Sequence, residues 1–192
     1  EAYALGQRLF GENKPQEMAE KQPYLPGDVE WHFVGHLQRN KVKMIAPFVS
    51  LIHSVDSERL LDTINKEAAK LNRVIPVLFQ LHISQDESKY GYTYEGLRQQ
   101  LRDKGPKQYP NVAIRGLMGI ATLTDNENQI RQEFRQLREF YEELKAAHFA
   151  DDPGFSQLSM GMTGDYKLAI AEGSTFIRVG SYIFGERQYA TA

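Results

Sequence analysis

Short apolar runs alternate with amphipathic segments along almost the whole chain. Runs rich in Val, Ile, Leu and Phe, bounded by Gly, Asp or Asn, are typical of buried strands. The predicted strands are Leu9–Gly11, Trp31–Gly35, Leu51–Val55, Ile75–Ile83, Ile114–Gly119, Gln157–Met160 and Phe176–Val179. The spacing between them leaves room for a helix after most strands.

The segments between the strands carry the residues that start and stop helices. Ser, Thr, Asp and Asn are favoured N-caps, and Gly is favoured just after a helix. The expected N-caps are Asn13, Ser57, Thr93, Thr124 (in a capping box with Glu127) and Asp165, and the expected stops are Gly105 and Gly173. The segment Glu1–Gly6 is typical of the tail of a helix that ends at a glycine, so we expect chain ahead of residue 1.

This alternation predicts parallel strands joined by crossover helices. With an eighth strand ahead of residue 1, the seven visible strands would complete a (β/α)8 barrel, a TIM-type fold. A doubly wound open sheet is the competing architecture, although no glycine-rich dinucleotide fingerprint follows the first strand. We expect one domain over residues 1–192 that lacks the first strand.

Composition narrows the classes of function. The chain has 192 residues, a net charge of −2 and no cysteine. The charge gives no attraction to nucleic acid or to acidic lipid, and the absence of cysteine excludes disulfides and thiolate catalysis. Because no apolar run approaches the roughly 20 residues that span a bilayer, we expect a cytoplasmic protein without a membrane partner.

Two loops near the end of the chain suit an anion. Gly161–Asp165 follows the sixth predicted strand, and Gly180 and Ser181 follow the seventh. In a barrel these are the loops after strands seven and eight, where phosphate is commonly held. Thr163, Gly180 and Ser181 are the natural donors. Ordinary turns with capping hydroxyls explain the same residues equally well.

Other polar residues have two interpretations each. Arg178 lies inside a strand, so it either points into a functional mouth or is an edge arginine with its head in solvent. Asn13 either contacts a ligand or caps a helix, and its spacing favours the cap. Glu12 and Asp56 are the carboxylates at strand ends, and both are interpreted as caps.

The histidines are not expected to hold a metal ion. His32 and His36 would lie about 13 Å apart on one strand, which is too far to share one ion. His53 and His82 also fall in strand runs. We expect these histidines to be barrel-interior or capping residues with satisfied hydrogen bonds.

Seven segments together resemble a known family, the pyridoxal 5′-phosphate (PLP) homeostasis proteins, which are single-domain, alanine-racemase-like, fold-type III proteins. The segments are FGENKPQE (Phe10–Glu17), WHFVGHLQRNK (Trp31–Lys41), HSVDS (His53–Ser57), ISQDESKYG (Ile83–Gly91), GLMGI (Gly116–Ile120), SMGMTGDYKLAI (Ser159–Ile170) and GSTFIRVGSYIFGER (Gly173–Arg187). They span nearly the whole chain, and jointly they are highly specific.

The resemblance implies a (β/α)8 barrel with PLP as cofactor at the C-terminal mouth. It implies phosphate contacts at Thr163, Gly180 and Ser181, and an Arg178 that faces the pyridine nitrogen. It also implies that the cofactor site includes Asn13, Met118, Ser159 and Gly161.

One departure from the family concerns the anchor of the cofactor. The family joins PLP as a Schiff base to a lysine in a segment like V-S-K on its first strand, and that segment is absent here. Lys14, Lys41, Lys89 and Lys167 all belong to other motifs. We expect that the lysine lies ahead of Glu1. Thr163 stands where the family usually has serine, which keeps the hydroxyl.

The resemblance and the chemistry of Arg178 together predict a PLP carrier without catalysis. Arginine only donates, so it would leave the pyridine nitrogen unprotonated and weaken the electron sink. The related racemases share that arginine but add a second domain with a catalytic tyrosine, and this chain ends soon after its last strand. We expect a monomer that buffers PLP and passes it to apo-enzymes. The alternatives are a small fold-type III enzyme, such as an amino-acid racemase, and a phosphate-ligand barrel enzyme unrelated to PLP.

Overall fold

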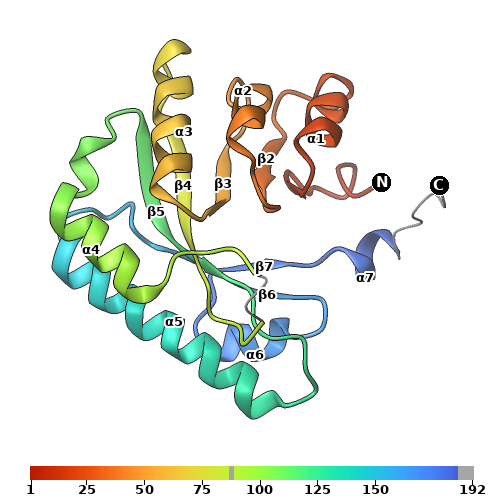
Figure 1. The fold of residues 1–192 in the computed structure, drawn as a ribbon. Helices are drawn as coiled ribbons and strands as arrows, with labels where there is room; N and C mark the ends of the chain where they lie inside the picture. Colours follow the sequence, from red (N-terminus) through yellow and green to blue (C-terminus); the bar gives the residue numbers. More distant parts are fainter. Residues whose placement is uncertain (87–88, 186–192) are drawn as a thin grey trace.

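The computed structural model describes residues 1–86 and 89–185, and its centre is a curved parallel sheet (Figure 1). The strands are β1 (Leu9–Glu12), β2 (Glu30–Phe33), β3 (Leu51–Val55), β4 (Ile75–Leu81), β5 (Val112–Gly119), β6 (Gln157–Met162) and β7 (Phe176–Arg178). Each strand pairs in parallel with the next, in the order β1-β2-β3-β4-β5-β6-β7. A doubly wound sheet would reverse its order at a switch point. The unbroken order therefore confirms the predicted barrel architecture, here with seven strands.

Helices follow the strands and cover the outside of the sheet. They are α1 (Pro15–Lys21), α2 (Val42–Ile45), α3 (Glu58–Lys70), α4 (Tyr94–Lys104), α5 (Glu127–His148), α6 (Tyr166–Ala171) and α7 (Ser181–Phe184), with 3-10 turns at Gln22–Tyr24, Arg39–Lys41 and Pro106–Gln108. In Figure 1, α1, α2 and α3 lie around the upper part of the curved sheet, and α4, α5 and α6 lie around its lower part. The helix α7 lies beyond the end of β7.

The main core lies between the sheet and these helices. On β4, Val77 and Phe79 point outward into this layer, where α3 contributes Leu61 and α5 contributes Phe134, all fully buried. Burying one such side chain contributes about 1.5–3 kcal/mol. The alternate β4 residues point inward, because successive side chains of a strand face opposite sides of the sheet.

The interior of the barrel has a different composition. It holds a small apolar cluster of Leu51, Leu78 and Met118, with Ile120 packed against it. Buried polar residues occupy the rest of the interior layer. These are His32, His53, Gln80 and Ser159.

Three of the expected residues, Ser57, Thr93 and Asp165, occupy N-cap positions as predicted. Thr93 accepts a hydrogen bond from the backbone N–H of Gly96 at 3.0 Å, so this cap is confirmed. Ser57 occupies the N-cap position of α3 but makes no side-chain capping bond. Its hydroxyl donates instead to Asp56 Oδ1 at 3.0 Å, because that carboxylate is adjacent in the chain.

The predicted capping box before α5 is wrong. Asn126 is the N-cap, and its side chain accepts from the N–H of Gln129. Thr124 accepts from the N–H of Asn126 two residues later, which orders the turn before the helix. The helix starts later than expected because the Asn126 amide reaches the first turn as well as a threonine hydroxyl would.

The prediction for Asn13 is wrong, whereas that for Asp165 is confirmed by position. Lys14, not Asn13, occupies the N-cap position of α1, and it makes no side-chain capping bond. Pro15 at the first helical position removes one N–H that a cap would otherwise bind. Asp165 is the N-cap residue of α6, but its carboxylate accepts from the N–H of Met162 in the preceding turn.

The first residues have the hydrogen bonds of a helix C-terminus. Gly6 has φ +98°, its N–H donates to Tyr3 O at 3.0 Å, and the N–H of Gln7 donates to Ala2 O at 3.1 Å. These two bonds and the left-handed glycine define a Schellman motif. The predicted glycine C-cap is therefore confirmed. Within residues 1–86 and 89–185, no helix is both long and apolar enough to cross a membrane.

Gly116 is expected to be intolerant of any side chain. It has φ +149°, and an added Cβ would lie 1.7 Å from Gln157 O on the neighbouring strand β6. Gly116→Ala should therefore lower the free energy of unfolding by at least about 2 kcal/mol, measured by urea denaturation. Gly27→Ala is the matched control, because nothing lies within 4 Å of its added Cβ. Equal stability of the two variants would contradict the close packing of β5 on β6.

Candidate functional site

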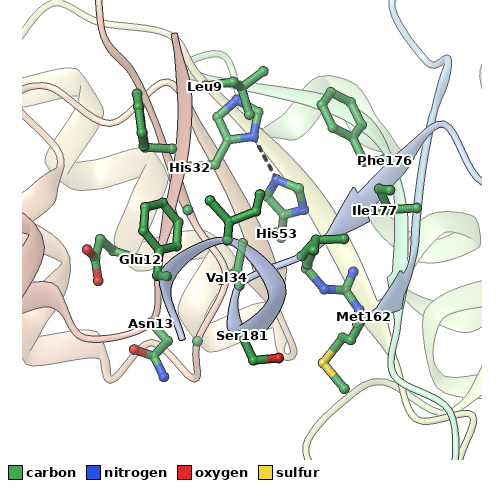
Figure 2. Close-up of a pocket in the computed structure, with 18 of the residues that line it drawn as sticks. Leu9, Glu12, Asn13, His32, Val34, His53, Met162, Phe176, Ile177 and Ser181 are labelled. Carbon is green, nitrogen blue, oxygen red and sulfur yellow. Dashed lines mark hydrogen bonds between the residues drawn. The ribbon is translucent and has the colours of Figure 1, made fainter. Parts of the chain in front are cut away.

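A large cavity lies where the two edge strands of the sheet, β1 and β7, face each other without pairing. Its volume is about 1680 Å³, and it is lined by the N-terminal turns, β1, the end of β2 and the segment from β7 through α7. Figure 2 shows Glu12 and Asn13 on one wall, Met162 and Ile177 on the other, and Ser181 between them. The cavity thus joins the first and last elements of the chain.

Arg178 holds the wall of this cavity together. Its Nη1 donates to Ser159 O at 3.0 Å and to Ser159 Oγ at 2.6 Å, and its Nη2 donates to Gly119 O at 2.9 Å. The guanidinium therefore bridges β7, β6 and β5. The interpretation of Arg178 as an edge arginine with its head in solvent is wrong, because three acceptors on neighbouring strands bind the head inside the barrel.

Two buried histidines continue this hydrogen-bonded chain. Ser159 Oγ lies 2.9 Å from His53 Nδ1, and His53 Nε2 lies 2.9 Å from His32 Nδ1 (Figure 2). Phe176 of β7 packs against both imidazoles, with ring centroids 5.6 and 5.8 Å away. The expectation of a satisfied interior histidine is confirmed for His53, because both of its ring nitrogens have partners. For His32, the described residues supply a partner to Nδ1 alone.

Burial sets the charges of this network. It lowers the pKa of His32 to about 4. It also holds the pKa of His53 well below its ordinary value, with smaller contributions from His32 and from the positive charge of Arg178. Burial lowers the pKa of Arg178 to about 10, so the guanidinium stays charged at neutral pH. The network therefore combines one cation with two neutral imidazoles.

The two predicted anion loops meet beside the cavity. The N–H of Gly180 lies 3.4 Å from Thr163 Oγ1, which brings the loop after β6 against the loop after β7. Ser181 starts α7 and is exposed to the cavity. Among the described residues, the backbone N–H groups of Ser181 and Tyr182 have no carbonyl partner, so they remain free to bind an anion.

The remaining predicted site residues divide into two groups. Asn13 lines the cavity, whereas Ser159 is fully buried behind Arg178. Met118 is fully buried in the interior cluster and does not line the cavity. Gly161 does not line it either, and an added Cβ there would lie 2.6 Å from Ala169 Cβ, so this glycine allows α6 to pack on β6.

The carboxylates at the strand ends are not helix caps. Glu12 pairs with Lys21 at the cavity rim. Asp56 accepts from Ser57 and lies 3.1 Å from His36 Nδ1, while the His36 ring stacks on Tyr90 with centroids 3.7 Å apart. The capping interpretation of Glu12 and Asp56 is therefore wrong, because side-chain cations and hydroxyls compete successfully for both carboxylates.

Sequence reasoning missed the pairing of His32 with His53. The available signal was a polar residue at a buried position on each of two adjacent apolar strands. Their contact depends on the register of β2 against β3, which the sequence pattern leaves open. His82 lies just beyond the end of β4, where its Nε2 contacts Asp86 O at 2.9 Å.

Comparisons with known proteins find relatives that match this chain over almost its whole length. The profile of the family described as alanine racemase, N-terminal domain, matches residues 1–188. The pyridoxal phosphate homeostasis protein of Aquifex aeolicus is 41% identical over 190 residues, which are 98% of this chain and 81% of that protein. The protein of the same name from Haemophilus influenzae is 37% identical over 194 residues, which are 100% of this chain and 80% of that protein.

The chain belongs to the alanine racemase N-terminal domain family, and within it to the pyridoxal phosphate homeostasis proteins. The structure of PipY from Synechococcus elongatus with PLP bound superposes with a TM-score of 0.84 at 39% identity, over 96% of this chain and 84% of PipY. Alanine racemase from Bartonella henselae, at 15% identity, shares the fold with a TM-score of 0.69, over 95% of this chain and 48% of the racemase.

The buried histidines predict how stability depends on pH. The ordinary histidine pKa of 6.5 applies to the unfolded chain, whereas that of folded His32 is about 4. As pH falls from 6.5 to 4, His32 binds a proton in the unfolded chain but stays neutral in the folded protein, so the folded state loses stability. Relative to His32→Phe, the parent should lose about 3 kcal/mol of unfolding free energy between pH 7 and pH 4, measured by urea denaturation. A difference independent of pH would refute the neutral, buried state of His32.

Proposed function

We propose that this protein binds PLP in the cavity between β1 and β7 and acts in PLP homeostasis as a carrier without catalytic turnover. The observation that carries the proposal is Arg178, a partly buried cation fixed in the cavity wall beside the two loops predicted to bind an anion. PipY, which shares this fold at 39% identity, has been solved with PLP bound.

The residues present fit the two ends of PLP. Thr163 and Ser181 offer a hydroxyl pair to the phosphate, and Ser181 and Tyr182 offer backbone N–H groups at the start of the short helix α7. Gly180 lies between them, with its N–H on Thr163 Oγ1. Arg178 would face the pyridine nitrogen with its Nε–H, which has no hydrogen-bond partner in the part of the chain that the structure describes. Asn13 would contact the ring from the opposite wall, where it lines the cavity. We assign Ser159, Met118 and Gly161 supporting positions behind that surface.

Arg178 favours binding over catalysis. PLP supplies an electrophilic aldehyde and an electron-withdrawing ring, whose strength depends on a protonated pyridine nitrogen. A guanidinium opposite that nitrogen only donates a hydrogen bond, so the nitrogen stays unprotonated. The residues of this wall therefore hold the ring and leave its reactivity low.

The lengths of the similar proteins support the same conclusion. This chain covers 81% of the Aquifex aeolicus homeostasis protein but 48% of the Bartonella henselae racemase, so the homeostasis protein is much the shorter of the two. We propose that PLP passes from this site to apo-enzymes, and that the protein acts as a cytoplasmic monomer.

Binding can be measured through Trp31, which is the only tryptophan of the chain and lines the cavity. PLP should quench its fluorescence, and pyridoxal, which lacks the phosphate, should bind at least about tenfold more weakly. Thr163→Val should weaken PLP binding and leave pyridoxal binding unchanged, because it removes only the hydroxyl near Gly180. Thr63→Val is the matched control, since Thr63 lies on α3 outside the cavity and its hydroxyl bonds to Arg59 O of the same helix. Equal affinity of PLP and pyridoxal would refute the phosphate site.

The absence of turnover has its own test. The full-length protein with saturating PLP should racemise L-alanine no faster than free PLP does, because the wall at Arg178 keeps the pyridine nitrogen unprotonated. Circular dichroism of the recovered alanine measures the rate. Multiple turnovers per protein molecule, lost in an Arg178→Gln variant, would show a fold-type III enzyme instead of a carrier.

A further inference from the structure

A hydrogen-bonded network in the cavity wall connects four strands and ends at a pair of histidines. It runs from Arg178 on β7 to Ser159 on β6, then to His53 on β3 and His32 on β2. Ser159 is fully buried, and the two histidines are 2% and 5% exposed. Buried polar groups of this kind are expected to satisfy all of their hydrogen bonds.

Arg178, the donor at one end of this network, sets the direction of every hydrogen bond between Arg178 and His32. Arginine has no acceptor, so Ser159 Oγ must accept from Arg178 Nη1 at 2.6 Å. The hydroxyl hydrogen of Ser159 then needs its own acceptor, and within the described residues His53 Nδ1, at 2.9 Å, is the one in reach. His53 must therefore carry its proton on Nε2 and donate to His32 Nδ1 at 2.9 Å. His32 in turn carries its proton on Nε2.

The reverse direction is disfavoured. If His53 donated from Nδ1, Ser159 Oγ would accept two hydrogen bonds and its own hydrogen would be buried without an acceptor. Leaving a buried donor unpaired costs more than the bond itself contributes. Arg178, at the end of the hydrogen-bonded network, thus selects one tautomer of each histidine.

We propose that His53 is a positioning residue for PLP binding, which acts through Ser159 to fix the orientation of the Arg178 guanidinium. The serine hydroxyl is a free rotor unless His53 accepts its hydrogen, and a hydrogen turned toward Arg178 would repel Nη1. With the hydroxyl held, Nη1 and Nη2 stay bonded to β6 and β5. Arg178 lines the cavity, and its Nε has no partner among the described residues, so Nε is left for a ligand. This role rests on the proposed function, because the group that Arg178 meets there is the pyridine ring.

The tautomers are measurable without any ligand or variant. Long-range 1H–15N correlation spectra of the 15N-labelled protein, without PLP, should show both His32 and His53 protonated on Nε2. A proton on Nδ1 of His53 would overturn the inference outright. This outcome is independent of PLP binding, so it separates failure of the inference from failure of the proposed function.

Two substitutions of His53 separate its two contacts. The amide of asparagine lies near the position of Nδ1, so His53→Asn retains the bond to Ser159 and loses the bond to His32. The amide of glutamine reaches the position of Nε2, so His53→Gln retains the bond to His32 and loses the bond to Ser159. Circular dichroism and thermal unfolding establish that each variant is folded before binding is compared.

The two variants should differ in their affinity for PLP. His53→Gln should bind PLP about tenfold more weakly than the parent and shift the absorption maximum of the bound cofactor, because Ser159 no longer orients Arg178. His53→Asn should stay within about threefold of the parent and keep its absorption maximum. Equal affinity and equal spectra for both folded variants would refute the positioning role, and the tautomer measurement remains decisive if either variant fails to fold.

Discussion

The hydrogen bonds of Arg178 fix the end of the sheet on which the site depends. Strand β7 has three residues, and its ladder to β6 is irregular between the pairs Ser159–Phe176 and Met162–Arg178. The Arg178 side chain compensates by donating to backbone oxygens of both β6 and β5. The start of α7 and the contact of Gly180 with Thr163 follow directly from this placement of β7.

The same interaction explains how a cation is kept inside the barrel. An isolated buried charge is costly unless hydrogen bonds replace the water that it loses. Here neutral oxygens replace that water, since Arg178 forms no ion pair within residues 1–86 and 89–185. Burial lowers the pKa of Arg178, and the negative charge of Asp165 partly offsets this effect. The guanidinium is therefore stabilised without being neutralised, and its charge is available to a ligand.

The two faces of the sheet have different roles, and the site lies on the inward face. Outward residues such as Val77 and Phe79 pack against helices and stabilise the fold. Inward positions hold polar residues above a small apolar cluster of Leu51, Leu78 and Met118. Substitutions on the inward face therefore alter the site more than the main core, whereas close backbone contacts such as that of Gly116 with β6 affect the fold as a whole.

The sequence by itself determined the strands, the helix faces and the barrel class, because side-chain periodicity and alternation of elements are local properties of the chain. It also determined that Thr163 and Gly180 would approach each other, since the barrel places the ends of consecutive strands side by side. The helix caps were less predictable, because neighbouring polar groups such as Asp56 and Asn126 compete for the same donors and acceptors over one or two residues. Only the tertiary structure decided the contact of His32 with His53, 21 residues apart, and of His53 with Ser159, 106 residues apart. Those contacts depend on strand register and on which side chains share the interior, and neither is encoded in any local pattern.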